Sequence, residues 1–111
     1  MNILFICTAN KDRSRTAELY FQYNYPKYRF RSAGINKYLS ERHGGIHLKR
    51  YMLDIADRII CMEQCHCDYI LNQIDKIYLD KIEVLNLGDT ESFMTGNLIG
   101  MLVDKFKLKT L

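Results

Sequence analysis

Residues 2–14 read NILFICTANKDRS: an unbroken apolar run, a short polar loop and the start of a helical pattern. The run Asn2–Cys7 has the length and composition of a buried parallel strand. Apolar residues then recur at helical spacing over Ser14–Tyr25, until Pro26 ends the pattern. Ligands of open parallel sheets bind beyond the carboxyl ends of the strands, so we expect the chemistry in the loop that begins at Cys7.

The rest of the chain continues this alternation of strand and helix patterns. Three more short apolar runs predict strands, and between 36 and 53 the pattern is clear only for a short helix from His47. Further helices are expected over 65–74 and from about Thr95 to Leu108, the last with Leu98, Met101, Leu102 and Phe106 on its apolar face. This order predicts an α/β fold of three layers, α/β/α, around a four-stranded parallel sheet. The additional predicted strands are Tyr28–Ser32, Asp57–Met62 and Ile82–Leu87.

Length and composition limit the classes of protein to consider. The chain has 111 residues, 48% hydrophobic and 26% charged, which predicts one folded domain over residues 1–111. The N-terminal sequence lacks the pattern of a secretion signal, and no apolar run reaches the roughly 18 to 20 residues of a membrane span. We therefore expect a cytoplasmic protein with reduced thiols and no membrane contact.

The net charge of +3 is mild. Basic residues are scattered, apart from a group at 27–31 and a tail at Lys105, Lys107 and Lys109. This distribution does not favour a nucleic-acid partner, but it is compatible with an anionic substrate.

The loop after the first predicted strand has the form C-x5-R-S, from Cys7 to Arg13 and Ser14. Five intervening residues can curl so that their backbone N–H groups converge on one tetrahedral anion, and the helix that begins near Arg13 adds partial positive charge there. The Arg13 guanidinium is a planar, permanently charged fork that matches two phosphate oxygens. The expected phosphate-binding residues are Thr8, Ala9, Asn10, Lys11, Asp12, Arg13 and Ser14.

Cys7 is the candidate nucleophile in this loop. The positive field of the helix terminus and of Arg13 favours the reactive thiolate, and a hydroxyl donor at Ser14 would stabilise it further. Asn10 suits a left-handed backbone conformation, if one loop residue must adopt it for the amides to point inward. Asp12 is expected to face solvent or a loop partner, because a carboxylate beside the sulfur would disfavour the thiolate.

The loop and its surroundings resemble the low-molecular-weight protein tyrosine phosphatase family. The similarity covers the family's C-x-x-N-x-x-R-S loop and the following x-x-A-E, here with Ala17 and Glu18. It continues in order through Ser32-Ala33-Gly34, the Gly45-Ile46-His47 region and the stretch at 56–63, ADRIICME, which is similar to the family's third strand. The resemblance therefore spans nearly the whole chain.

This resemblance implies a hydrolase of phosphate monoesters that works through a phosphocysteine, without metal or cofactor. The implied substrate is a phosphotyrosine protein or a small aryl phosphate, with inorganic phosphate or a similar oxyanion bound at the loop. Cys7 and Arg13 would be catalytic, with Asp89 as the general acid and Glu91 in reserve. Ser32 and His47 would support Asn10 and Ser14 from behind.

The chain departs from the family pattern at positions that contact substrate. Thr90 follows Asp89 where relatives usually have proline, and Phe93 is the only nearby aromatic residue. Asp12 stands where a second cysteine is frequent, and Arg15 replaces a frequent proline. These differences fall on the walls of the expected site, so they bear on which phosphate ester the chain accepts.

The remaining cysteines leave other interpretations open. The run from Cys61 to Cys65-His66-Cys67 contains zinc-ligand residue types, but it lacks a second ligand pair at the usual spacing. Packing roles for these cysteines are favoured. Arsenate reduction, in which such cysteines relay a disulfide, is one alternative function, and a catalytically weak phosphate-binding module is another.

Overall fold

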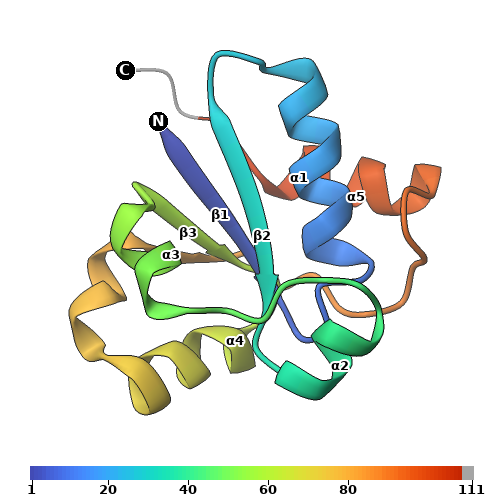
Figure 1. Ribbon diagram of the computed structural model, residues 1–111. Coiled ribbons are helices and arrows are strands. Elements are labelled where there is room, and N and C mark those ends of the chain that lie inside the picture. The colour runs from blue at the N-terminus through green and yellow to red at the C-terminus, as the bar shows by residue number, and fades with distance from the viewer. Residues whose placement is uncertain (109–111) are drawn as a thin grey trace.

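The computed structural model describes residues 1–108, which form a four-stranded parallel sheet between two layers of helices (Figure 1). The strand order is β2-β1-β3-β4, with Cys7 at the end of β1 opposite Gly34 at the end of β2. The α/β architecture expected from the sequence is confirmed. The strands are β1 (Asn2–Cys7), β2 (Arg29–Gly34), β3 (Arg58–Cys61) and β4 (Ile82–Val84).

Within residues 1–108, five α-helices, one π-helix and one 3-10 helix connect and cover the strands. The segment 36–53, for which the sequence predicted only a short helix from His47, holds α2 and the start of α3, which begins at Arg50. His47 instead forms an isolated bridge with Gly34. The helices are α1 (Arg13–Asn24), α2 (Lys37–Arg42), α3 (Arg50–Ile55), α4 (Gln64–Tyr69), the π-helical η1 (Ile70–Ile74), the 3-10 helix η2 (Lys76–Lys81) and α5 (Gly96–Lys105).

The predicted fourth strand over 82–87 is too long, because β4 ends at Val84. Asn86 takes a left-handed backbone conformation with φ +56°, which breaks the extended chain. The Leu87 N–H still donates to the Met62 carbonyl at 2.7 Å, so the chain stays fastened to the sheet edge after the strand has ended. That attachment brings the loop after β4 to the end of the sheet where Cys7 lies.

Two apolar cores lie on opposite faces of the sheet, because side chains alternate along each strand. Phe5 and Cys7 face α1 and α5, and Leu4 and Ile6 face α3 and α4. The phenyl rings of Phe5, Phe21 and Phe106 pack with centroids 4.9 to 5.8 Å apart. Burial of these strands on both faces explains why the sequence of β1 is continuously apolar.

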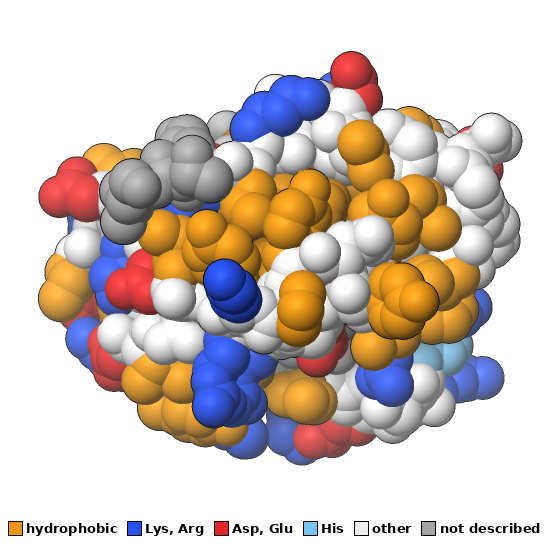
Figure 2. Space-filling model, turned by 90° about the horizontal axis from the view of Figure 1, so that it is seen from above, with side chains coloured by type: hydrophobic (Ala, Val, Ile, Leu, Met, Phe, Trp, Pro, Cys, Tyr) orange, Lys and Arg blue, Asp and Glu red, His pale blue; other side chains and the backbone are white. Residues whose placement is uncertain are grey.

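The last helix is shorter than predicted, ending at Lys105, but Leu98, Leu102 and Phe106 of its expected apolar face are buried. A hollow of about 320 Å³ between α1 and α5 is lined by residues that include Tyr25 and Val103. Apolar side chains gather broadly on the face seen in Figure 2. Lys109 of the predicted basic tail lies outside the described residues, and within residues 1–108 no helix has the length and apolar character to cross a membrane.

Candidate active site

Cys7 ends β1 with its thiol at the base of the loop that joins β1 to α1. Its side chain is 2% exposed, and its Sγ lies 2.9 Å from the Ser14 Oγ. The Asn10 side-chain amide donates to the same Ser14 oxygen at 2.8 Å. That oxygen could also accept from a protonated sulfur, but the thiolate form of Cys7 has no proton to donate, so the Ser14 hydroxyl is then the donor. Ser14 is therefore oriented as a hydrogen-bond donor to Cys7, which stabilises a thiolate.

Asn10 holds the loop in shape through its side chain, whose two amide hydrogens and carbonyl oxygen are all hydrogen-bonded. It takes a left-handed conformation with φ 50°, so Asn10 is the loop residue that adopts the conformation for which its residue type is suited. Its amide nitrogen donates both hydrogens, to Ser14 and to Ser32 Oγ, each at 2.8 Å. Ser32 Oγ in turn donates a hydrogen bond to Glu18, so a chain of hydrogen bonds runs from that carboxylate through Asn10 and Ser14 to the sulfur.

The third bond of Asn10 comes from the backbone, not from the predicted imidazole. The Ile46 N–H donates to Asn10 Oδ1 at 2.8 Å. Within residues 1–108, the His47 side chain makes no hydrogen bond to the loop, and the bridge that pairs His47 with Gly34 is held by the flanking Ile46 carbonyl and Leu48 N–H. The expected support therefore exists, but one residue earlier and through a main-chain group.

Two glycines allow neighbouring segments to approach the loop closely. A Cβ at Gly34 would lie 2.7 Å from the Thr8 carbonyl oxygen, and a Cβ at Gly45 would lie 2.7 Å from the Asn10 carbonyl oxygen. These contacts are too short for any side chain, so both positions require glycine for the observed packing. The Ser-Ala-Gly and Gly-Ile-His motifs of the sequence thus form the back wall of the loop.

The start of α1 offers unpaired backbone donors at the loop. Asp12 is the N-cap residue, but its carboxylate makes no capping bond, because its Oδ1 accepts from the Phe93 N–H at 2.9 Å. Within residues 1–108, the backbone N–H groups of Asn10, Lys11 and Asp12 have no protein acceptor. An anion bound at the loop is the natural partner for such groups at a helix N-terminus. The expectation that Asp12 faces a loop partner is confirmed.

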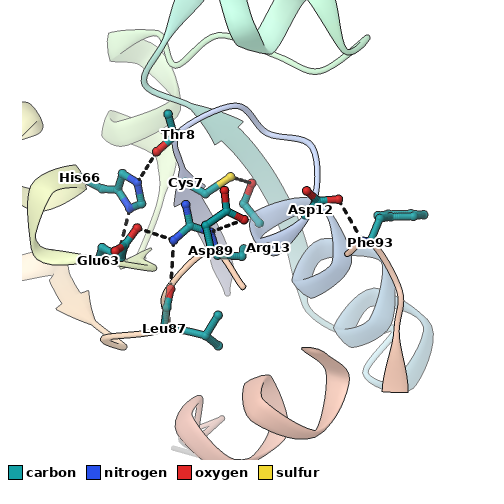
Figure 3. A network of polar contacts seen from close by, with 10 residues as sticks. Cys7, Thr8, Asp12, Arg13, Glu63, His66, Leu87, Asp89 and Phe93 are labelled. Carbon is teal, nitrogen blue, oxygen red and sulfur yellow. Dashed lines mark hydrogen bonds and ion pairs between the residues drawn. The ribbon is translucent and has the colours of Figure 1, made fainter. Parts of the chain in front are cut away.

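Arg13 is buried, with 3% of its side chain exposed, and it is clamped from three sides (Figure 3). Its Nη1 donates to Glu63 Oε2 at 2.5 Å and to the Leu87 carbonyl at 3.0 Å. Its Nε lies 3.8 Å from Asp89 Oδ1. Both hydrogens of Nη1 are used, so the edge formed by Nε and Nη2 is the one left for a ligand.

His66 supports the other side of the loop as a neutral imidazole. Its Nδ1 accepts from the Glu63 N–H at 3.1 Å, so the ring proton sits on Nε2 and is donated to Thr8 Oγ1 at 3.0 Å. Burial, together with the nearby Arg13 charge, lowers the pKa of His66 from 6.5 to about 4. The hydroxyl proton of Thr8 is then free for a further acceptor.

Sequence reasoning missed Glu63 and His66 as members of the site. Both come from the junction of β3 and α4, which follows a predicted strand as the loop after Cys7 does. Their position at the carboxyl end of a parallel strand was the available signal, since such ends meet at one edge of the sheet. The Leu87 carbonyl carried no such signal, because any residue type supplies that group.

Asp89 lines the hollow above Cys7, which has a volume of about 230 Å³. Its side chain is 63% exposed, close enough to Arg13 for an ion pair and open to solvent on its other side. Glu91 does not line this hollow. The other lining residues are Ala9, Lys11, Asp12, Arg13, Leu39 and His43.

The three remaining cysteines do not share the nucleophile's surroundings. Cys61 and Cys67 are buried in the core on the opposite face of the sheet from Cys7. Burial raises the pKa of Cys61 and of Cys67, so both are thiols at neutral pH. The zinc set suggested by the sequence is not gathered: the group with ligand atoms within 4.8 Å of one another joins Glu63, Cys65 and His66, and both His66 nitrogens are already hydrogen-bonded.

Comparison with known proteins agrees with this arrangement. The YwlE arginine phosphatase from Geobacillus stearothermophilus is 23% identical and matches 94% of this chain and 82% of its own, with a TM-score of 0.63. The low molecular weight protein tyrosine phosphatase from T. tengcongensis is 23% identical, with coverages of 96% and 99% and a TM-score of 0.67. The tyrosine phosphatase Wzb from Escherichia coli, solved with phosphate, is 20% identical, with coverages of 94% and 91% and a TM-score of 0.74.

The chain has the fold of the low molecular weight protein tyrosine phosphatases. The resemblance drawn from the C-x5-R-S loop and the motifs after it is thus confirmed at the level of structure. No family model matches the chain, and no curated protein matches it in sequence. In this low molecular weight phosphatase fold, the β1–α1 loop, the β3–α4 junction and the loop after β4 converge on Cys7 and Arg13 (Figure 3).

Proposed function

We propose that the protein hydrolyses phosphate monoesters of phenols, with phosphotyrosine proteins or small aryl phosphates as substrates, through a phosphocysteine at Cys7. The observation that carries this proposal is the hydrogen-bonded thiol beside a buried arginine. The Cys7 Sγ accepts from Ser14, and Arg13 is held beside it by Glu63 and Leu87. A nucleophile and an anion-binding fork in one shallow hollow suit phosphoryl transfer, which depends mainly on positioning and charge stabilisation.

In the first step the Cys7 thiolate attacks phosphorus, forming the S–P bond as the P–O bond to the phenol breaks. The unpaired amides of the loop and the Nε/Nη2 edge of Arg13, which lies near Asp89 but is not used by Glu63 or Leu87, hold the phosphoryl oxygens. Asp89 gives its proton to the departing phenoxide. Its place on the rim of the hollow, opposite the buried sulfur, supports this role over Glu91.

In the second step a water molecule breaks the S–P bond. Asp89, now a carboxylate, takes a proton from the water as its oxygen bonds to phosphorus, and the sulfur leaves as a thiolate. Ser14 donates to that thiolate, which makes it a better leaving group. The products are a phenol and inorganic phosphate, and the enzyme returns to its starting state without a metal or cofactor.

The positions of Cys61 and Cys67 weigh against arsenate reduction through these two thiols. A disulfide relay needs a second thiol that can reach the Cys7 sulfur. Cys61 and Cys67 lie across the sheet from it and are held as thiols by burial. The hydrolytic reaction uses Asp89 instead, which a relay would leave without a task.

Hydrolysis of p-nitrophenyl phosphate and of phenyl phosphate by the wild type, Cys7→Ser and Asp89→Ala tests the proposal. We expect no turnover by Cys7→Ser. Asp89→Ala should lose about 10²- to 10⁴-fold with phenyl phosphate and less with p-nitrophenyl phosphate, whose leaving group needs little protonation.

Wild-type turnover equal to that of Cys7→Ser would contradict the proposal. A Glu91→Ala variant, which should retain activity, is the matched control for the acid. Arsenate turnover coupled to a thiol donor and lost in Cys61→Ser, Cys65→Ser or Cys67→Ser would replace hydrolysis by the redox alternative.

A further inference from the structure

A second hollow adjoins the one above Cys7. It has a volume of about 300 Å³ and is lined by Lys11, Arg15, His43, Gly44 and Phe93. Lys11 and His43 line both hollows, so the two lie side by side on the surface. A molecule whose phosphate sits at Arg13 can therefore extend into the second hollow without leaving the protein.

The second hollow presents positive charge that the described part of the chain does not neutralise. Within residues 1–108, neither Lys11 nor Arg15 forms an ion pair or a side-chain hydrogen bond. The nearest acid in sequence, Asp12, lines only the first hollow and is bonded to the Phe93 N–H. Arg13, by contrast, is held by two carboxylates, so the cations of the second hollow stand out as available for a ligand.

Backbone hydrogen bonds hold the segment around Phe93, which forms one wall of this hollow, against α1. The Phe93 N–H donates to Asp12, and the Met94 N–H donates to Thr16 Oγ1 at 2.9 Å, so the loop after β4 is tied to the first turn of α1. Figure 3 shows Phe93 on this loop beside the start of the helix. Phe93 is 41% exposed, which offers an apolar surface next to the two cations.

We propose that the second hollow binds a second anionic group of the substrate, so that the enzyme prefers phosphate esters with another negative charge near the reacting phosphate. Arg15 and Lys11 bind that group, and Phe93 packs against the stem that carries it. The inference rests on the proposed phosphatase function and names the substrate class. Two sources share this chemistry: acidic side chains beside a phosphotyrosine, and the second phosphate of a small aryl bisphosphate.

The expected preference follows from the strength of exposed ion pairs. Two such contacts in a half-open hollow give about a 5- to 10-fold higher kcat/KM for a substrate with the second charge. The preference should shrink as salt rises from 0.1 M to 1 M, because the screening length falls from about 10 Å to about 3 Å.

Two matched substrate pairs test the proposal. In one, a phosphotyrosyl peptide carries two glutamates on each side of the phosphotyrosine, or glutamines at the same places. In the other, resorcinol bisphosphate is compared with resorcinol monophosphate, corrected for its two esters. Arg15→Gln should reduce the preference to about 2-fold or less while the kcat/KM for p-nitrophenyl phosphate is retained. Arg31→Gln, which removes an exposed arginine of β2, is the control and should keep the preference.

The outcomes separate this proposal from the one on which it rests. Hydrolysis of p-nitrophenyl phosphate without any preference for the second charge, or with a preference that Arg15→Gln leaves intact, overturns the subsite alone. Preference in only one pair identifies the source of the charge. If no phosphate ester is hydrolysed, the phosphatase function fails, and anisotropy titration of the two labelled peptides still decides whether Arg15 recognises the acidic one.

Discussion

At the scale of single residues, the site is built from hydrogen bonds whose directions are determined by their neighbours. Ser14 accepts from Asn10 and donates its own proton to the Cys7 thiolate, which has no proton to give. His66 donates to Thr8 because its other nitrogen accepts from a backbone N–H. In both cases the state of one hydrogen-bond partner determines whether the buried group donates or accepts in its other bond. The direction of the hydrogen bonds around the loop is thereby determined.

Removal of the Ser14 hydroxyl should lower the reactivity of Cys7. In Ser14→Ala the thiolate loses its donor, so we expect alkylation of Cys7 by iodoacetate at pH 6 to slow about 10-fold. The modified peptide is followed by mass spectrometry, which separates Cys7 from the exposed Cys65.

Ser32→Ala is the matched control for this measurement. Its hydroxyl also accepts from Asn10 at 2.8 Å, but it does not contact the sulfur. Both variants therefore lose one Asn10 partner, and only Ser14→Ala should slow alkylation strongly. Equal slowing in the two would show that the effect comes from a disturbed loop and not from the hydrogen bond to sulfur.

At the scale of elements, the site depends on where three connections leave the sheet. The β1–α1 loop supplies the nucleophile and the amides, the β3–α4 junction supplies Glu63 and His66, and the chain after β4 supplies the Leu87 carbonyl and Asp89. Parallel strands bring their carboxyl ends to one edge, so these segments meet although up to 74 residues separate them along the chain. At the β3–α4 junction the same two residues cap α4 and support the site. The Glu63 N–H donates to the His66 ring at the start of α4, while Glu63 also binds Arg13 and His66 also binds Thr8.

The buried His66 should make folding stability depend on pH. The folded state keeps a pKa of about 4 against 6.5 for an unfolded histidine, so the unfolded state binds the proton more readily. The contribution of neutral His66 to the free energy of unfolding is therefore fully present above pH 6.5, and it is lost as the pH falls towards 4. Between pH 7 and 5 this one group should cost about 2 kcal/mol, measured by urea unfolding.

A substitution without a titrating ring isolates this contribution. His66→Gln should have a lower free energy of unfolding than the wild type at pH 7. When the pH is lowered from 7 to 5, its free energy of unfolding should fall by about 2 kcal/mol less than that of the wild type. His43→Gln, at an exposed position, should leave the wild-type slope unchanged. A wild-type slope in His66→Gln would assign the pH dependence to other groups.

At the scale of the whole molecule, the sheet separates two environments. One face carries Cys7 with α1 and α5, and the other carries Cys61 and Cys67 with α3 and α4. The phosphate loop lies at the end of the sheet, where the unpaired amides and Arg13 create a site for an anion before any substrate arrives. Such a preformed site couples ligand binding to the stability of the entire fold.

Inorganic phosphate should therefore stabilise the protein against heat. At about 100 times its Kd, phosphate should add about 2.7 kcal/mol, which raises the Tm by about 10 °C for a chain of this length. Sodium chloride at equal ionic strength should not reproduce the shift, measured by differential scanning fluorimetry. Arg13→Ala should lose most of it, and Arg31→Gln should keep it. A full shift in Arg13→Ala would mean that phosphate binds elsewhere.

The local features of this protein could be predicted from its sequence because they depend on near neighbours. The buried strand at 2–7, the loop from Cys7 to Ser14, the left-handed Asn10 and the parallel alternation follow from apolar periodicity and residue chemistry. Element ends were less accurate, as β4 shows: it stops at Val84 because Asn86 turns the chain, and hydropathy does not report that turn.

The partners of the catalytic groups were decided only by the tertiary structure. That Glu63 and the Leu87 carbonyl hold Arg13, that Ile46 replaces the His47 ring behind Asn10, and that Lys11 and Arg15 line a second hollow all depend on which loops meet at the sheet edge. Sequence spacing determines chemistry within one loop, because the chain itself sets those distances. Contacts between loops depend on the twist and register of the whole sheet, and these are expressed only when the chain is folded.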